Sequence, residues 1–184
     1  PILPMSDRKV IARRAAMELP RNAIINLGIG MPEGVSSVAV EEGFADQLTM
    51  TVEAGQIGGV PASGAAFGGA YNPEFVNDMI RHFDFYDGGG LDVCFLGAAE
   101  VDSMGNCNVS KFTRTVGPGG FINIASNTPK CVFCGTLTAG GLKTEIKDGK
   151  LSILQEGRNK KYMKQVKQVT FSGSNAVKSG QTVL

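Results

Sequence analysis

The sequence of 184 residues contains no tryptophan and one histidine, and aromatic residues make up only 7% of it. Proteins that bind single-stranded nucleic acid stack bases on aromatic side chains, so this composition does not favour that role. The sequence also has no large excess of either charge, because it contains 18 Lys and Arg residues and 17 Asp and Glu residues. Nucleic-acid binding typically needs a basic excess. We therefore expect no nucleic-acid partner.

Long apolar runs are absent as well. No run approaches the roughly 20 residues that a membrane-spanning helix needs, and runs such as residues 23–27 have the length of a strand. The first residues lack the order of charged, apolar and small side chains that marks a secretory signal. We therefore expect no membrane contact and a cytoplasmic location. The 42% hydrophobic content is typical of one folded domain.

The four cysteines are Cys94, Cys107, Cys131 and Cys134. The last two have Cys-x-x-Cys spacing, but a zinc site needs a second such pair or histidines, and His82 stands alone. Cys131 and Cys134 lie in an apolar run, residues 130–136, where strand alternation sends them to opposite faces. We interpret them as buried apolar residues and expect no metal.

Apolar runs alternate with helical patterns in the first half of the chain. Ser6 is expected to cap a helix over residues 7–19, which Pro20 ends. Strands are expected at 23–27, 48–52, 92–96, 130–136 and 166–171; further helices at 32–42, 73–81 and from 121; a turn between extended flanks at 101–112; and a hairpin joining 142–146 to 151–154 through Asp148-Gly149. This order predicts an α/β fold with an open, mostly parallel sheet flanked by helices and a β-rich C-terminal part.

In such sheets ligands bind beyond the carboxyl ends of the strands. Three glycine-rich loops follow predicted strands or precede a predicted helix. The first, residues 28–32, follows a predicted strand and opens a helix, and its backbone amides could hold a phosphate. The next glycine of a dinucleotide fingerprint comes one residue late, at Gly34, and no acidic residue follows at the usual distance, which disfavours NAD. A strand-to-helix turn with positive φ explains the loop equally well.

The second loop, residues 53–59, begins with Glu53 at the end of a predicted strand. Its sequence neighbours are small or apolar, and none of them neutralises the carboxylate. A poorly solvated carboxylate can act as a nucleophile or a base. A solvated loop glutamate is the structural alternative.

The third loop, residues 117–121, offers successive amides at Gly119 and Gly120 that could hold an oxyanion or a carboxylate, although turn geometry alone would also account for it. Between the loops, Asn106 and Asn108 provide neutral amides that could orient a carboxylate.

Two further features remain. His82 is interpreted as a packing residue. The run 158–161, together with Lys164, is interpreted as a solvated basic face that could steer an anionic cofactor.

Residues 26–32, 53–59, 105–109 and 117–121, in this order, resemble the catalytic half of the glutamate-dependent (family I) CoA-transferases. The similarity covers nearly the whole chain. It is greatest to the single-chain type that uses short-chain acyl-CoA with acetate or propionate. In the two-subunit oxoacid enzymes the glutamate follows a serine and precedes Asn-Gly, whereas here residues 52–55 read Val-Glu-Ala-Gly.

The resemblance implies that Glu53 is the nucleophile, which attacks an acyl-CoA thioester and passes through a mixed anhydride to a glutamyl-CoA thioester. It further implies that the amides of Gly119 and Gly120 stabilise the oxyanions and that Asn106 positions the glutamate. The backbone contacts to CoA would come from Gly28, Ile29, Gly30 and Met31. CoA would be a substrate, and no permanent cofactor is expected.

The same resemblance implies an N-terminal half of similar architecture, on the same chain or a partner subunit, with the active site between the halves, a short-chain carboxylate as co-substrate, and a homo-oligomer. We assign residues 1–6 to a linker remnant and 7–184 to a beta-type catalytic domain. We expect the chain to be a fragment that is inactive alone. Phe67 and Tyr71 are expected to shape the acyl pocket.

Three alternatives remain open. One is the beta subunit of a two-subunit 3-oxoacid CoA-transferase. Another is a sugar-phosphate isomerase that uses residues 28–31 as a phosphate loop. The third is a non-catalytic ligand-sensing domain of the same fold.

Overall fold

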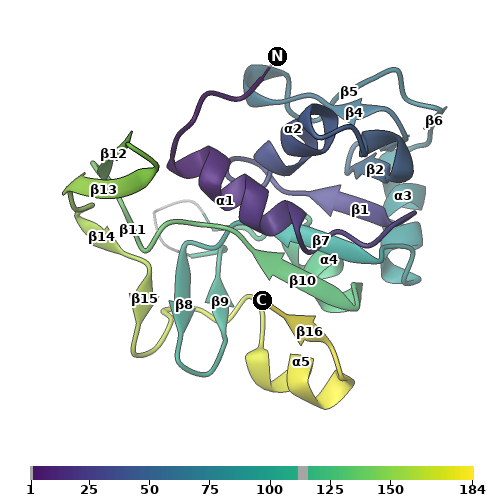
Figure 1. Ribbon diagram of the computed structural model, residues 1–184. Helices are drawn as coiled ribbons and strands as arrows, with labels where there is room; N and C mark the ends of the chain where they lie inside the picture. The colour runs from purple at the N-terminus through teal and green to yellow at the C-terminus, as the bar shows by residue number, and fades with distance from the viewer. Residues whose placement is uncertain (1, 112–115) are drawn as a thin grey trace.

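The computed structural model, which describes residues 2–111 and 116–184, is built on a seven-stranded sheet (Figure 1). Its strand order is β16-β10-β7-β1-β2-β3-β6. The five strands from β16 to β2 run parallel, β3 pairs antiparallel with β2, and β6 pairs antiparallel with β3. These strands are β1 (Ile24–Leu27), β2 (Thr49–Val52), β3 (Gln56–Ile57), β6 (Phe75–Val76), β7 (Val93–Leu96), β10 (Lys130–Phe133) and β16 (Thr182–Val183). The predicted open, mostly parallel sheet is confirmed.

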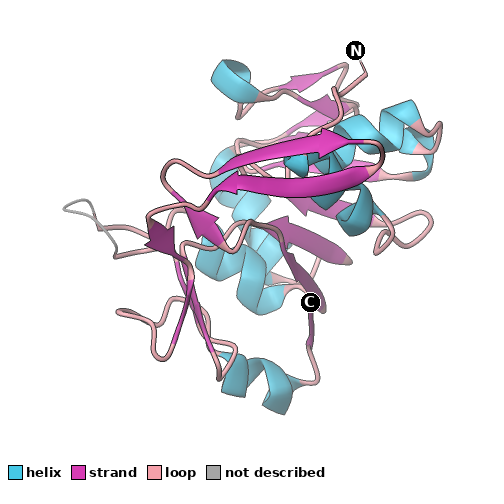
Figure 2. Ribbon diagram, turned by 60° about the vertical axis from the view of Figure 1, so that its left-hand side comes forward, coloured by secondary structure: helices cyan, strands magenta, loops and turns pink. Residues whose placement is uncertain are grey.

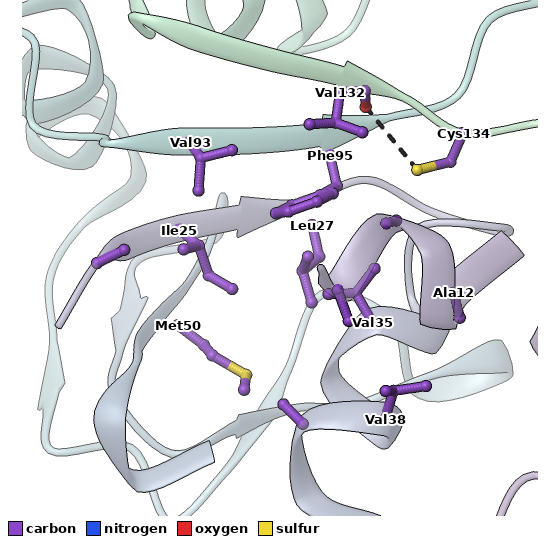
Figure 3. Close-up of a cluster of buried hydrophobic side chains, with 14 residues drawn as sticks. Ala12, Ile25, Leu27, Val35, Val38, Met50, Val93, Phe95, Val132 and Cys134 are labelled. Atoms are coloured by element: carbon purple, nitrogen blue, oxygen red, sulfur yellow. Dashed lines mark hydrogen bonds between the residues drawn. The ribbon is translucent and has the colours of Figure 1, made fainter. Parts of the chain in front are cut away.

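Helices cover both faces of this sheet and enclose two hydrophobic cores. They are α1 (Asp7–Ala16), α2 (Gly34–Glu41), α3 (Met79–Asp87), α4 (Phe121–Asn127) and α5 (Gly173–Ser179), with short 3-10 turns η1 (Ala45–Gln47) and η2 (Gly64–Ala66). Helices α1 and α2 pack on one face, around Ile25, Met50 and Phe95 (Figure 3). Helices α3 and α4 cover the other face. Burial on both sides explains why the central strands read as continuous apolar runs.

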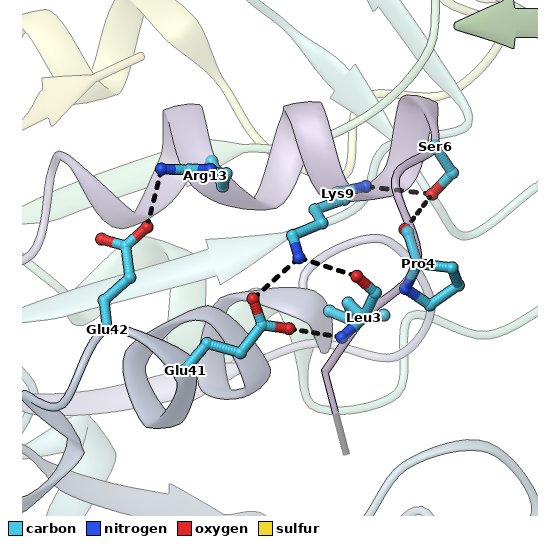
Figure 4. A network of polar contacts seen from close by, with 7 residues as sticks. All are labelled: Leu3, Pro4, Ser6, Lys9, Arg13, Glu41 and Glu42. Atoms are coloured by element: carbon cyan, nitrogen blue, oxygen red, sulfur yellow. Dashed lines mark hydrogen bonds and ion pairs between the residues drawn. The ribbon is translucent and has the colours of Figure 1, made fainter.

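The first helix begins where the sequence predicts. The Ser6 hydroxyl accepts a hydrogen bond from the Lys9 amide at 3.3 Å, as an N-cap does. The ammonium of Lys9 then pairs with Glu41 of α2 at 2.8 Å and donates to the Leu3 carbonyl at 2.7 Å (Figure 4). These contacts hold α1 and the segment before it against α2.

The C-terminal part is rich in short strands, as predicted (Figure 2). The remaining strands are β4 (Val60–Pro61), β5 (Ala70–Tyr71), β8 (Glu100–Asp102), β9 (Cys107–Asn108), β11 (Thr138–Ala139), β12 (Lys143–Lys147), β13 (Lys150–Gln155), β14 (Asn159–Lys160) and β15 (Tyr162–Met163). Strands β12 and β13 form the predicted hairpin. The extended flanks expected at 101–112 pair as β8 and β9, while Phe112 lies outside the described residues.

Two predicted elements are wrong. The helix expected at 73–81 starts only at Met79, because Asp78 accepts a hydrogen bond from the Arg81 amide and caps it there, and residues 75–76 form β6 instead. Residues 166–171 form no strand. Their first two amides, of Val166 and Lys167, donate to carboxylate side chains on β8 rather than to a neighbouring strand. Helix α5, which Ser172 caps, was not predicted.

The cysteines are buried thiols on both faces of the sheet. Cys131 belongs to the core under α4 and Cys134 to the core under α1, which confirms the predicted opposite faces. Burial raises the pKa of Cys134 to about 11 and that of Cys107 to about 12, so both remain protonated near neutral pH. Within residues 2–111 and 116–184, no cluster of three or more His, Cys, Asp or Glu side chains is arranged to hold a metal ion. None of the helices described there has the length and apolarity to cross a membrane.

Candidate active site

A cavity of about 1140 Å³ opens at the carboxyl ends of the central parallel strands. The loops after β1, β2, β7 and β10 contribute to its lining, together with the start of α4. All three glycine-rich loops singled out in the sequence therefore meet in one place. This is the edge of a parallel sheet at which α/β proteins bind their ligands.

Glu53 follows β2 directly and lines this cavity. The chain turns sharply behind it. Gly55 has φ of 117°, and a Cβ there would collide with the carbonyl oxygen of Asn77. The Glu53 side chain is half-buried, and this burial raises the pKa of its carboxyl group. Among the described ion pairs none includes Glu53, so its charge is held without a cation.

The Glu53 carboxylate lies against Gly120, the residue that precedes α4. A Cβ on Gly120 would stand 2.5 Å from Oε2 of Glu53 and 2.7 Å from Cζ of Phe83. Gly120 has φ of −77°, an ordinary value, so space and not backbone conformation requires a glycine here. The amides of Gly119 and Gly120 donate to no protein acceptor within the described part of the chain. Both are therefore free to bind an oxyanion in the cavity.

The first loop contributes Gly28, Ile29 and Met31 to the cavity, three of the four residues predicted to contact CoA. Gly30 does not line it, and its amide donates to Glu33 at 2.7 Å. The backbone at Gly28 comes close to β7, where a Cβ would lie 3.2 Å from Cδ2 of Leu96.

Asn106 is not brought to this cavity, contrary to the prediction that it positions Glu53. It lies in the turn between β8 and β9, where its Nδ2 donates to Asp102 at 3.2 Å. Its Oδ1 accepts from the amide of Gly173 at 3.1 Å. Asp102 takes three further bonds from backbone amides of this region, which hold the turn closed around its carboxylate. In this structure Asn106 fixes the turn and the start of α5.

Glu100, which the sequence analysis missed, is the second carboxylate of the cavity. Burial by itself would raise the pKa of Glu100, but hydrogen bonds from Asn108 at 2.7 Å and from Lys167 outweigh it and lower that pKa. The alternation of Glu100 and Asp102 along a short strand was the available signal. The two carboxylates of the cavity thus have pKa values pushed in opposite directions, and only Glu53 is poorly stabilised as an anion.

The lining of the cavity includes four cations, Arg158, Lys160, Lys161 and Lys167, which we call the basic wall. Lys161 is half-buried, and burial lowers the pKa of its ammonium group. It takes part in no ion pair of the described residues, whereas Lys167 pairs with Glu100 at 3.1 Å. Lys164 does not line the cavity. The basic run predicted as a solvated face therefore faces a ligand space.

Of the two residues expected to shape an acyl pocket, Phe67 lines the cavity and Tyr71 does not. The Tyr71 side chain is 64% exposed. Phe67 lies in the segment between β4 and β5, whereas Tyr71 is the last residue of β5.

Comparisons with known proteins agree with this geometry. No family model matches the chain. It is 52% identical over 182 residues to the acetate CoA-transferase YdiF of Escherichia coli K12, which covers 98% of the chain and 34% of that protein. It is 53% identical over 190 residues to the caffeate CoA-transferase of Acetobacterium woodii, which covers 100% and 36%. The acetate CoA-transferase subunit beta of E. coli K12 is 29% identical over 168 residues, 82% of the chain and 70% of that subunit.

Solved structures show the same relationship. The crystal structure of YdiF apoenzyme from E. coli O157:H7 superposes with a TM-score of 0.91 at 50% identity, over 98% of the chain and 34% of that protein. A thioester complex of YdiF with CoA superposes with a TM-score of 0.89, at the same identity and coverage. The chain thus spans about one third of the length of these relatives. By sequence and by fold it belongs to the family I CoA-transferases, of which it represents the beta-like half.

Proposed function

We propose that this chain carries the nucleophilic half of an acyl-CoA:carboxylate CoA-transferase, with Glu53 as the nucleophile. The observation that carries the proposal is a half-buried carboxylate of raised pKa that lies against Gly120, in a cavity whose lining includes Lys161, a cation without an ion pair among the described residues. The identity of 52% to an acetate CoA-transferase and the thioester complex of its close relative with CoA support the same chemistry. The relatives are named for acetate and for caffeate, and both of these acceptors are carboxylates. We therefore propose a carboxylate as the acceptor of this protein.

The chemistry follows from the geometry. An oxygen of the Glu53 carboxylate attacks the acyl carbonyl of acyl-CoA, the C–S bond breaks, and CoA leaves as a thiolate from an acyl-glutamyl anhydride. The thiolate then attacks the glutamyl carbonyl and expels the acyl group as a carboxylate, which leaves a glutamyl-CoA thioester. An incoming carboxylate reverses both steps. Each attack creates an oxyanion, which the free amides of Gly119 and Gly120 would stabilise.

The anionic end of CoA is assigned to the basic wall. The phosphates of the coenzyme carry negative charge, and Lys161 is a partly desolvated cation without a protein partner among the described residues. Gly28, Ile29 and Met31, which line the same cavity as these cations, would contact the arm that bears the thiol. Binding energy from the distant phosphates can then drive the reaction at the thioester.

We further assign the missing part of the site to a second segment of the kind that the longer relatives possess, on the same chain or on a partner subunit. The chain covers only 34% of the relatives that it matches at 52% identity. A homo-oligomer and a cytoplasmic location belong to the same proposal, as does the domain assignment of residues 1–6 and 7–184.

The nucleophile is tested by mass spectrometry of the intact protein after incubation with acetyl-CoA. We expect a CoA adduct on the peptide that contains Glu53, removed by hydroxylamine and absent in Glu53→Gln. Glu42→Gln, a change to an exposed glutamate that does not line the cavity, is the matched control and should keep the adduct. CoA binding without an adduct in the wild type would show that Glu53 is not the nucleophile and would favour a sensor or an isomerase.

The contact with Gly120 is tested with Gly120→Ala. The added methyl group must displace the Glu53 carboxylate by about an ångström, and a shift of that size costs about 100-fold in rate. Gly117→Ala is the control, because its Cβ would meet no atom within 4 Å and its φ is not positive. Steady-state assays should give a kcat reduced about 100-fold only for Gly120→Ala. Equal rates for the two variants would contradict the proposed site.

The basic wall is tested with Lys161→Met, assayed with acetyl-CoA and with acetyl-pantetheine, which lacks the phosphates. Loss of a charge-assisted contact should raise KM for acetyl-CoA about tenfold and leave KM for acetyl-pantetheine unchanged. Lys164→Met removes a neighbouring charge that does not line the cavity and should affect neither substrate. An equal effect on KM for both substrates would show that the phosphates of CoA do not bind to the basic wall.

The need for a second segment is tested by assaying residues 1–184 alone and together with the remaining segment of the protein. We expect no turnover from the chain alone and recovery when both parts are produced together. Full turnover by the 184 residues would refute the assignment of a shared site.

A further inference from the structure

A buried polar cluster that the proposed chemistry does not use lies behind the nucleophile. It consists of Asn26 on β1, Thr51 on β2, and His82 and Tyr86 on α3, and each of these residues is no more than 1% exposed. We call it the Tyr86 cluster. Polar groups buried to this degree are costly unless they are hydrogen-bonded, and apolar side chains would serve the core equally well.

The Tyr86 hydroxyl is the centre of the cluster. Its oxygen lies 2.8 Å from Nε2 of His82, 3.2 Å from Nδ2 of Asn26 and 2.9 Å from Oγ1 of Thr51. Thr51 in turn donates to the carbonyl oxygen of Ile25 at 2.8 Å. One hydroxyl group thus ties together two neighbouring strands and the helix that covers them.

The directions of these bonds are fixed by the number of protons available. Thr51 spends its only proton on Ile25, so it accepts the proton of Tyr86. The Tyr86 oxygen then accepts from Asn26 and from Nε2 of His82, which places a proton on Nε2. Nδ1 of His82 is buried without a partner among the described residues, so a second, charged proton there would be unsatisfied and the ring is a neutral imidazole with a bare Nδ1. Burial lowers the pKa of His82, which agrees with a neutral ring. The chain of donors runs from α3 and Asn26 through Tyr86 and Thr51 to the backbone of β1.

The cluster lies directly behind Glu53. Thr51 lies on β2 and precedes Glu53, the first residue after that strand, by two positions. Phe83 joins them, since its ring contacts Tyr86 edge-on at 5.5 Å between centroids and its Cζ borders the space between Gly120 and Glu53. Burial raises the pKa of Tyr86 to about 12, and the nearby charge of Glu53 adds to this effect.

We propose that Tyr86 is a positioning residue for Glu53. The Tyr86 cluster fixes the end of β2 against α3, and its hydrogen-bond donors bond to acceptors other than Glu53. The carboxylate is therefore held in place while the side that faces α3 gives it neither a donor nor a water molecule. This inference rests on the proposed function. A donor or a water molecule behind the carboxylate would stabilise its charge and weaken it as a nucleophile. The described hydrogen bonds of the cluster lead to acceptors within it or on β1, and none of them reaches Glu53. The two buried cluster atoms without a partner among the described residues, Oδ1 of Asn26 and Nδ1 of His82, accept hydrogen bonds and have no proton to donate to Glu53.

The titratable and charged groups around Glu53 are few among the described residues. Tyr86 and His82 lie behind it on α3, Cys134 follows β10, and Glu100 and the basic wall line the same cavity. A change in the pH profile caused by a variant of Tyr86 is therefore assigned to Glu53, whose carboxylate must be ionised to attack.

The test is Tyr86→Phe in the intact transferase. The variant leaves Nδ2 of Asn26 and Nε2 of His82 without an acceptor, and these donors, or the water that satisfies them, then stabilise the Glu53 carboxylate. We expect kcat to fall about tenfold, KM for acetyl-CoA to stay within about twofold, and the acidic limb of the kcat/KM profile to move to lower pH. Tyr71→Phe, a change to an exposed tyrosine outside the cavity, is the control and should match the wild type.

A second pair of variants distinguishes the loss of the hydrogen bond from a loss of folding. Thr51→Val keeps the shape and removes the acceptor of the Tyr86 proton, so it should show the same lower kcat, whereas Thr51→Ser keeps the hydroxyl and should recover most of it. Thermal melts ensure that each variant is assayed while folded. Wild-type kcat and pH profile in Tyr86→Phe would overturn the inference while the Glu53 adduct still upheld the transferase. Absence of turnover and of the adduct in the wild type would instead overturn the proposed function.

Discussion

The contact between the Glu53 carboxylate and Gly120 is the constraint on which the site depends. A Cβ at Gly120 would lie 2.5 Å from Oε2, so the Glu53 carboxylate occupies space that any other residue at position 120 would fill. This contact joins the end of β2 to the start of α4, two elements that stand far apart in the sequence. The amides of Gly119 and Gly120, which bond to no acceptor in the described part of the chain, stand at this junction.

The cavity holds two carboxylates with opposite electrostatic surroundings. Glu100 is bonded by Asn108 and Lys167, which lower its pKa, while Glu53 is desolvated without a cation among the described residues, and its pKa is raised. A carboxylate stabilised by hydrogen bonds is a structural anchor, and one that lacks them is reactive. Behind Glu53, the hydrogen bonds of the Tyr86 cluster join its members to one another and not to the carboxylate. Glu53 therefore lacks on this side the hydrogen bonds that stabilise Glu100.

Local sequence signals were sufficient where the controlling interaction is local. The Ser6 cap, the hairpin at Asp148-Gly149 and the buried central strands were predicted because each depends on neighbouring residues. The helix expected at 73–81 was displaced by the cap at Asp78. The strand expected at 166–171 failed because its first amides bond to side chains more than 60 residues away in the sequence.

The sequence by itself determined the α/β class, the order of the glycine-rich loops and the choice of Glu53, because strand periodicity, turn residues and an isolated carboxylate among small residues are all local properties. Only the tertiary structure decided which of the chosen residues meet. It turned the basic run toward the cavity, turned Asn106 away to Asp102, and revealed Glu100 and Tyr86. The reason is physical, since pKa shifts, close backbone approach and buried hydrogen bonds arise from groups that come together only when the sheet and its covering helices pack.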